Sequence, residues 1–247
     1  MQYYFNVKLV GNRFSFSPMD IHHILNVIRA KNGDKVVCVH EGTQYLCVLQ
    51  YERDIPFATI DRKLQNSNEL PFEITLIYGI PKNDKFELVL QKATELGVSR
   101  IVPYQADRSI VKLLNNDNSS KLIRWNRILK EASEQSRRNK IPEITPITSL
   151  DSLVAYLGEW NFVADENKWS MGTSELWDYC QKKMPNSISL VIGPEGGFSQ
   201  NELNFLQEKG WKSISLGRRI LRSETAAISL LSWFSFLGDS YYREVVQ

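Results

Sequence analysis

The chain has 247 residues, 43% of them hydrophobic and 23% charged, which excludes a disordered polymer and allows a sizeable core. Its 30 Lys and Arg nearly balance 28 Asp and Glu, so only the local distribution of charge can indicate partners. Three cysteines are too few for a disulfide framework, and no apolar run suits a signal peptide or a transmembrane helix. Cys38, His40 and Cys47 lack the fourth ligand that zinc needs. We therefore expect a cytoplasmic protein with no metal and no membrane partner.

Residues 1–70 are predicted to form a small β-barrel domain. Two runs rich in β-branched residues, 36–40 and 45–49, flank a glycine-containing four-residue loop and predict a hairpin. Apolar residues recur at helical spacing in residues 18–29, which indicates one short helix. The polar, turn-prone residues 65–71 follow and mark a domain boundary.

Strands and helices are predicted to alternate in the second domain, residues 71–247. The expected strands are residues 72–80, 101–103, 161–164, 188–192 and 213–216. The expected helices are residues 85–96, 119–138, 175–183, a helix from Ser199, and 223–237. This alternation is typical of an α/β fold with a mostly parallel sheet and helices on both faces.

The loop after the strand at 188–192 is the most informative part of the sequence. It holds three glycines, a proline and a glutamate: Gly193, Pro194, Glu195, Gly196 and Gly197. Ser199 and Glu202 form a capping box that begins the next helix. Ligands of α/β sheets bind beyond the carboxyl ends of strands, and glycines allow positive φ and close approach of the backbone. The loop therefore indicates a ligand site, although a tight strand–helix connection without a ligand stays an alternative.

A second strand end, at residues 215–226, carries three arginines. Arg218, Arg219 and Arg222 suit phosphate, because guanidinium groups match its oxygens. The neighbouring Leu216, Ile220 and Leu221 could wall an apolar slot for a flat ring. The alternative is a solvated loop with acidic surface partners.

Residues 121–140 are locally basic, with seven Lys and Arg against two Glu. The basic residues are Lys121, Arg124, Arg127, Lys130, Arg137, Arg138 and Lys140. Beside an arginine-bearing pocket this run predicts a track for an RNA backbone, although a solvated helix face is the alternative.

The two C-terminal motifs, Gly193–Ser199 and Leu216–Ala226, resemble the RsmE family of small-subunit ribosomal RNA uridine-N3 methyltransferases, of the SPOUT class. Further matching runs are Pro81–Glu87, Gln91–Val98, Arg108–Ser109, Glu131–Arg137, His22–Leu25 with Arg29, and Gly33–Asp34. The chain departs from the family at Glu41–Thr43 and at Ser223, where threonine is commoner. The resemblance therefore extends over nearly the whole chain.

The resemblance implies a PUA-like RNA-binding barrel, a deep trefoil knot in the second domain, and a homodimer. It implies S-adenosylmethionine bound by the loops of that domain, with the strand end at 163–166 as a third side. The cofactor residues would be Val163, Ala164, Gly193, Pro194, Glu195, Gly196, Gly197, Leu216, Gly217, Ile220 and Leu221. The substrate would be small-subunit ribosomal RNA, in an assembled or assembling subunit.

Methylation of uridine N3 requires loss of a proton and stabilisation of the uracil anion. Arg222 and Arg108 are the candidates for stabilisation, and Glu195 and Glu224 are the acidic candidates. The candidate RNA-binding residues are His22, His23, Arg29, Arg127, Arg137, Arg138, Arg218 and Arg219. A ribose 2′-O methyltransferase on the same scaffold and a non-catalytic ribosome-assembly factor remain alternatives.

Overall fold

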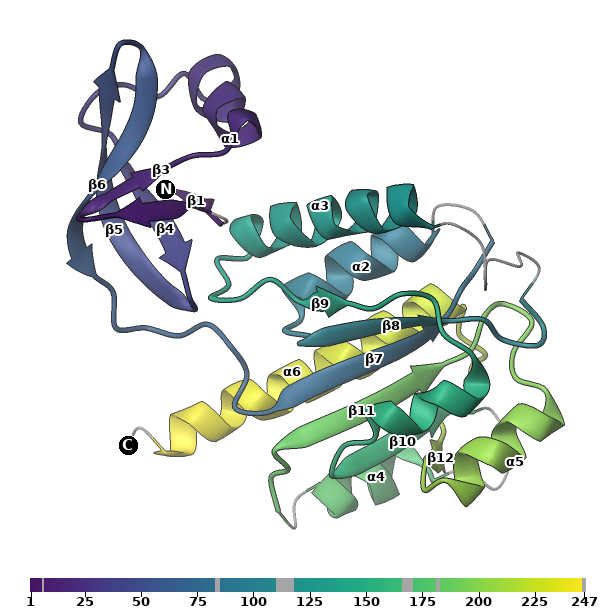
Figure 1. Cartoon of the computed structure of the whole chain (residues 1–247). Helices are drawn as coiled ribbons and strands as arrows, with labels where there is room; N and C mark the ends of the chain where they lie inside the picture. Colours follow the sequence, from purple (N-terminus) through teal and green to yellow (C-terminus); the bar gives the residue numbers. More distant parts are fainter. Residues whose placement is uncertain (6, 83–84, 110–117, 166–170, 181–182, 246–247) are drawn as a thin grey trace. The chain divides into compact units, whose positions relative to one another are not determined.

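A computed structural model describes the chain except residues 6, 83–84, 110–117, 166–170, 181–182 and 246–247 (Figure 1). The chain forms two compact units. The first unit comprises Met1–Glu69 and Lys130–Ile141, and the second comprises Leu70–Leu129 and Pro142–Gln247. The first unit is therefore built from two stretches of sequence. No helix in the described ranges is both long and apolar enough to cross a membrane.

The first unit contains a curled six-stranded sheet in the order β1-β4-β5-β6-β3-β2 (Figure 1). Its strands are β1 (Gln2–Tyr4), β2 (Lys8–Val10), β3 (Arg13–Ser15), β4 (Lys35–His40), β5 (Thr43–Glu52) and β6 (Ile55–Lys63). β1 is parallel to β4 and the other pairs are antiparallel. Tyr4, Phe14, Ile24 and Leu49 form part of the buried core.

The predicted hairpin is present with a tighter turn than the sequence indicated. His40 pairs with Thr43, so the loop has two residues and not four. Glu41 and Gly42 both have positive φ, 48° and 74°, which matches the twist of the flanking strands. The predicted helix is divided into α1 (Pro18–His22), capped by Ser17, and a π-helical turn η1 (His23–Val27).

The second unit contains a fully parallel six-stranded sheet in the order β12-β10-β11-β7-β8-β9, which confirms the predicted α/β class. Its strands are β7 (Glu73–Gly79), β8 (Arg100–Tyr104), β9 (Glu143–Ile144), β10 (Trp160–Ala164), β11 (Ser187–Ile192) and β12 (Lys212–Ile214). The helices are α2 (Lys85–Glu95), α3 (Ser119–Gln135), η2 (Leu150–Tyr156), α4 (Thr173–Cys180), α5 (Gln200–Glu208) and α6 (Ser223–Val245). Strand β9 and the 3₁₀ helix η2 were not predicted, and α3 ends before Arg138.

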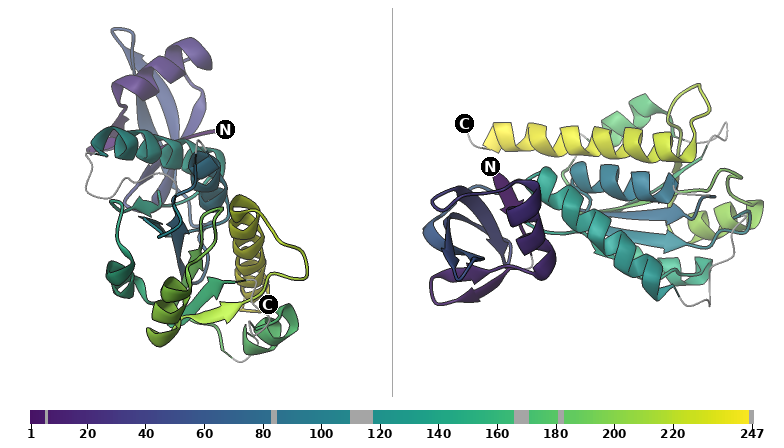
Figure 2. Two further views of the ribbon diagram at one scale, coloured as in Figure 1. Left: turned by 90° about the vertical axis from the view of Figure 1, so that its right-hand side faces the viewer. Right: turned by 90° about the horizontal axis from the view of Figure 1, so that it is seen from above.

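Helices cover both faces of this sheet (Figures 1 and 2). Val163 of β10 packs in a core with Leu153 of η2 and Leu206 of α5. The adjacent Phe162 contacts the rings of Tyr179 and of Phe234 in α6, on the opposite face. Successive side chains of a strand alternate between faces, so residues buried on both sides read as one apolar run. All parallel strands end at one edge, and the candidate site lies there.

Candidate functional site

A cavity of about 540 Å³ lies at the carboxyl ends of β10, β11 and β12. Its lining comes from residues 164–165, 192–198, 215–217 and 219–223, at or just after the ends of these three strands, together with Lys85, Arg108, Leu203 and Ala226. This volume is typical of sites for small molecules. The structure thus brings together the two loops that the sequence singled out.

The loop after β11 depends on close approaches of the backbone. Gly79 at the end of β7 faces Pro194, and a Cβ atom there would lie 2.6 Å from the proline Cδ. Gly197 has a φ of +66°, and its N–H donates to the carbonyl of Pro194 over 2.9 Å. Gly193 and Gly196 do not have positive φ, so that part of the sequence interpretation was wrong. A Cβ at Gly196 would instead lie 3.1 Å from the Cβ of Arg108.

The buried carboxylate of Glu202, only 1% exposed, joins this loop to the segment after β8. Tyr104 donates its hydroxyl to Glu202 over 2.7 Å, and the backbone N–H of Asp107 donates to the same oxygen over 2.9 Å. The other oxygen accepts from the N–H of Ser199, which completes the predicted capping box. Arg108 follows directly, and its guanidinium donates to the carbonyl of Gly196 over 3.2 Å.

Lys85, at the start of α2, is a lining residue that the sequence interpretation missed. Its Nζ lies 3.2 Å from Glu195 Oε1 and 3.6 Å from Glu224 Oε1, so one ammonium joins two loops. Ser223 donates to Glu224 over 3.3 Å and accepts from the hydroxyl of Tyr78 over 2.9 Å. Lys85 follows β7, and β7 pairs with β11 in the sheet. This position beyond a strand end was the signal by which the sequence could have indicated Lys85 as a site residue.

The carboxyl group of Glu195 is held in its ionised form. Partial burial raises its pKa, but hydrogen bonds from its own backbone, Lys85 and the backbone of Lys82 outweigh burial. The pKa of Glu195 therefore lies below its usual range. A carboxylate of low pKa is a weak proton acceptor, which favours an electrostatic role over general-base catalysis.

The remaining predicted pocket residues divide into two groups. Arg219, Arg222, Leu216, Gly217, Ile220 and Leu221 line the cavity together with Ala164. Ile220 is 82% exposed although apolar. Val163 is buried in the sheet core and Arg218 is exposed, and neither belongs to the lining. Asn83, Asp84 and Glu166, which the family resemblance included, lie outside the described residues.

The predicted RNA-binding residues also separate by exposure. His22, Arg29, Arg127 and Arg137 are exposed, and His23 is half-buried, with Nδ1 3.3 Å from the hydroxyl of Tyr4. Arg138 is 3% exposed and forms a bidentate ion pair with Glu69, so the prediction that it contacts RNA phosphates was wrong. Lys130 of the basic run is likewise paired, with Asp20 and Glu134.

The fold and the site define the class of the protein. A family model described as an RNA methyltransferase domain matches residues 68–235, and one described as an RNA methyltransferase PUA domain matches residues 19–58. The chain is an RNA methyltransferase of the PUA-containing type.

The relatives specify the family. The ribosomal RNA small subunit methyltransferase E of Bacillus subtilis is 36% identical, over 90% of this chain and 90% of its own. The corresponding protein 2 of Borreliella burgdorferi is 32% identical, over 94% of this chain and 95% of its own. The chain belongs to the ribosomal RNA small subunit methyltransferase E family, RsmE.

Two solved structures resemble the chain over almost its full length. A methyltransferase from Legionella pneumophila, in complex with S-adenosylmethionine, is 30% identical with a TM-score of 0.84, covering 96% of this chain and 97% of its own. The RsmE protein of Neisseria gonorrhoeae, bound to S-adenosylmethionine, is 27% identical with a TM-score of 0.82, covering 96% and 98%. Both contain the same cofactor.

Proposed function

We propose that this chain transfers a methyl group from S-adenosylmethionine to N3 of a uridine in small-subunit ribosomal RNA. The observation that carries the proposal is the cavity of about 540 Å³, built from three strand-end loops and lined by Arg108 and Arg222. Membership of the RsmE family supports the substrate, and the two cofactor-bound relatives support the methyl donor.

The residues of the cavity fit a nucleoside-sized cofactor. Ile192, Leu216 and Leu221 provide apolar lining for a flat ring. Gly197 and Gly217 have positive φ, which residues with a Cβ rarely adopt. Because they are glycines, they leave the neighbouring backbone polar groups uncovered. The proposed cofactor-binding residues are Ala164, Gly193, Pro194, Glu195, Gly196, Gly197, Leu216, Gly217, Ile220 and Leu221.

S-adenosylmethionine supplies an electrophilic methyl group on a positively charged sulfur. The chain's own residues must orient the uracil and stabilise the negative charge left when N3 loses its proton. Arg222, exposed in the lining, and Arg108, fixed through Asp107 by Glu202, can each place a guanidinium beside a uracil carbonyl oxygen. A guanidinium at this position would stabilise the negative charge on the uracil.

The acidic pair has a different proposed role. Lys85 holds Glu195 and Glu224 together, and the depressed pKa keeps Glu195 ionised at neutral pH. We assign Glu195 to electrostatic orientation of the positively charged donor and not to proton transfer. Glu224 is then the remaining acidic candidate for accepting the proton that uridine N3 loses.

Nucleoside mass spectrometry tests the proposed reaction. Small subunits that lack the modification would be incubated with the protein and S-adenosylmethionine, in parallel with protein-free RNA. We expect 3-methyluridine, and the comparison of the two substrates identifies the preferred assembly state. A 2′-O-methylated nucleoside would instead indicate the ribose methyltransferase. Cofactor binding without any product would indicate the assembly factor.

We further propose a homodimer in the cytoplasm, where ribosomal subunits are modified in bacteria. The apolar residues Leu230, Leu231 and Phe234 of α6 are buried within their own unit. Their apolar character is therefore no evidence for contact with a second chain. Two other apolar residues, Phe236 in α6 and Ile220 at the cavity, are 65% and 82% exposed and support an interface. Light scattering at micromolar concentration should give the mass of two chains, and a monomer mass would contradict the dimer. The trefoil knot stays a prediction of the family resemblance.

A further inference from the structure

One ammonium group, that of Lys85, joins two carboxylates beside the proposed cofactor cavity. Lys85 lines the cavity at the start of α2, and its side chain is 35% exposed. Its Nζ lies 3.2 Å from Glu195 Oε1, in the loop after β11, and 3.6 Å from Glu224 Oε1, at the start of α6. Both members of this acidic pair therefore lie within ion-pair distance of the same cation.

Glu224 is the anchored member of the acidic pair. Its side chain is 13% exposed, and its second oxygen accepts from the hydroxyl of Ser223 over 3.3 Å. Ser223 in turn accepts from the hydroxyl of Tyr78 over 2.9 Å, and Tyr78 is fully buried in β7. Hydrogen-bonded networks of this kind make their members rigid. Lys85 is therefore tied, through Glu224 and Ser223, to the core of the sheet.

Glu195 is the member of the pair that faces the cavity. It lines the cavity, and its side chain is 32% exposed. Its carboxylate is held by Lys85 and by the backbone N–H groups of Lys82 and of Glu195 itself. The same loop contains three glycines, which leave its backbone few side-chain contacts. The ion pair with Lys85 is therefore the side-chain contact that can hold this carboxylate in one position.

The charged residues around the cavity are of two kinds. With both carboxylates ionised, the acidic pair and Lys85 together carry one net negative charge. Asp165, after β10, is a further lining carboxylate. The other charged lining residues are Arg108, which donates to the carbonyl of Gly196, and two arginines after β12, Arg219 and Arg222. A positively charged group of a ligand is attracted by the carboxylates and repelled by the arginines.

We propose that Lys85 is a positioning residue that holds Glu195 at the cavity for the positive charge of S-adenosylmethionine, and thereby makes the site prefer this donor to its neutral product. The inference rests on the proposed function, which supplies the methyl donor. Methyl transfer to N3 leaves the bonding electron pair on the sulfur, so S-adenosylhomocysteine has no sulfonium charge. An ionised carboxylate therefore favours the donor, which helps the product to leave between turnovers.

Loss of the ammonium should make Glu195 sensitive to pH. In the wild type, partial burial raises the pKa of Glu195, but hydrogen bonds from its own backbone, Lys85 and the backbone of Lys82 hold it below its usual range. Lys85→Met removes the cation and leaves the negative charge of Glu224 nearby, and both changes raise the pKa of Glu195. Tyr78 stays protonated, because burial and the charges of Glu224 and Glu195 raise its pKa.

The expected sign follows from these shifts. A carboxylate attracts a sulfonium only while it is ionised, and it loses that charge as the pH falls through its pKa. In the wild type this loss occurs below the ordinary range of a glutamate, because the pKa of Glu195 is depressed. In Lys85→Met it should move upward toward neutral pH. A merely structural role of Lys85 would instead weaken binding by the same factor at every pH.

The test measures the affinity of the full-length protein for S-adenosylmethionine and S-adenosylhomocysteine by calorimetric titration, between about pH 8 and about pH 5.5. Each affinity is divided by that of the wild type at the same pH, which removes the titration of the ligands' own groups. For Lys85→Met, this ratio should fall at least about three-fold toward the acid end for S-adenosylmethionine and stay constant for S-adenosylhomocysteine. Lys85→Arg keeps the charge and should restore a constant ratio for both ligands.

The matched control is Lys92→Met in the same helix. Lys92 pairs with Glu95 over 2.9 Å and is 37% exposed, close to Lys85, but it does not belong to the cavity lining. This variant should match the wild type. The double variant Lys85→Met/Glu195→Gln removes the titrating carboxylate, so its ratio should be constant. Circular dichroism verifies each fold, and Lys85→Gln provides the same test if methionine unfolds the protein.

A loss in Lys85→Met that is constant with pH, or equal for the two ligands, would overturn the inference. The same holds if the double variant keeps the pH dependence or if Lys92→Met shows it. Neither titration involves RNA, so the proposed function fails separately. A wild type that yields no methylated uridine, with the expected titrations, would reject the proposed function and retain the role of Lys85. Methylated uridine together with a pH-independent Lys85→Met would do the reverse.

Discussion

Two arginine-bearing segments, residues 218–222 and 137–138, look alike in sequence and differ in structure. In the second unit, Arg219 and Arg222 are exposed and line the cavity. In the first unit, Arg138 is buried against Glu69, while the adjacent Arg137 is exposed with a positive φ of 60°. A cluster of positive charges therefore does not reveal its use, because a carboxylate distant in sequence can neutralise part of it inside the protein.

Arg222→Ala should produce the largest effect of the changes considered. If Arg222 stabilises the uracil anion, turnover at saturating RNA should fall roughly 100-fold, while the free energy of unfolding and RNA affinity stay nearly unchanged. Single-turnover methylation and urea unfolding measure the two quantities. Weakened RNA affinity with a full single-turnover rate would make Arg222 a docking residue.

Arg138→Ala should show the opposite pattern. It leaves the Glu69 carboxylate without its guanidinium partner in a largely buried site, which should destabilise the protein by about 3 kcal/mol. Urea unfolding measures this loss, and Arg137→Ala is the control, because that side chain is exposed. Equal, small effects of the two variants would mean that the burial of Arg138 contributes nothing to stability.

Substitution of Gly196 tests how closely the proposed cofactor loop, residues 193–197, approaches Arg108. A Cβ there meets the Arg108 Cβ at 3.1 Å and its carbonyl oxygen at 3.2 Å, so valine must displace one segment. Overpacking of about 1–3 kcal/mol should lower S-adenosylmethionine affinity roughly ten- to hundred-fold, and alanine should do so less. Calorimetric titration of both variants provides the series. Unchanged affinity in folded Gly196→Val would remove this loop from the cofactor site.

The ionised state of Glu195 predicts a pH dependence. Because its pKa is depressed in the folded protein, its favourable interactions persist at neutral pH and are lost as the pH falls through that pKa. Wild-type affinity for S-adenosylmethionine should therefore fall a few-fold only at pH values below the ordinary titration range of a glutamate. Glu195→Gln should bind more weakly at neutral pH and lack this decline. A wild-type decline near neutral pH would contradict the assignment.

The smallest effect is expected for the exposed basic residues. Arg127→Ala and Arg137→Ala should each reduce the salt dependence of RNA binding by a slope of about 0.9 if the residue contacts one phosphate. Lys209→Ala, in the segment after α5, is the control for loss of one positive charge elsewhere. An unchanged slope would exclude these residues from the RNA track, and cofactor binding should be unaffected throughout.

Local sequence patterns predicted the α/β unit because residues close in sequence, such as helix caps, determine where its helices and strands begin and end. The capping box of Ser199 and Glu202 is a clear case, and it is present as predicted. Contacts between distant segments were not predictable from such patterns. Gly79 is small because Pro194 packs against it, and Lys85 belongs to the site because it joins Glu195 to Glu224. The strand order that produces these contacts departs from the order in the chain.

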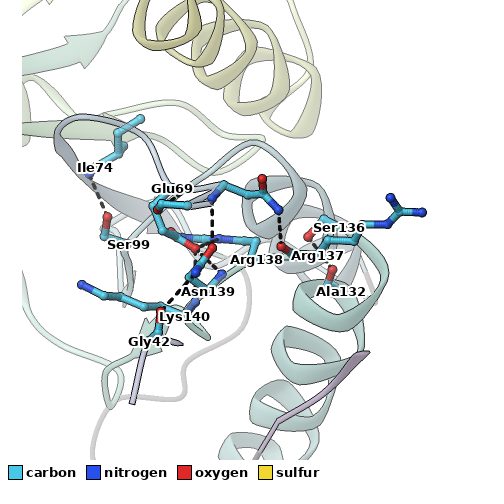
Figure 3. Close-up of polar contacts among 12 residues, drawn as sticks. Gly42, Glu69, Ile74, Ser99, Ala132, Ser136, Arg137, Arg138, Asn139 and Lys140 are labelled. Atoms are coloured by element: carbon cyan, nitrogen blue, oxygen red, sulfur yellow. Dashed lines mark hydrogen bonds and ion pairs between the residues drawn. The ribbon is translucent and has the colours of Figure 1, made fainter. Parts of the chain in front are cut away.

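The first unit is assembled from Met1–Glu69 and Lys130–Ile141, and this has a practical consequence for domain exchange. A gene fragment that stops at Glu69 would encode a sheet without the partners of Glu69 and Gln44, both of which belong to the second stretch. Such a fragment would lose the ion pair and the hydrogen bonds that residues 138–140 make with Glu69 (Figure 3), and those that residues 137 and 139 make with Gln44, and would be prone to unfold. A functional transplant of this module between relatives must therefore move both stretches together.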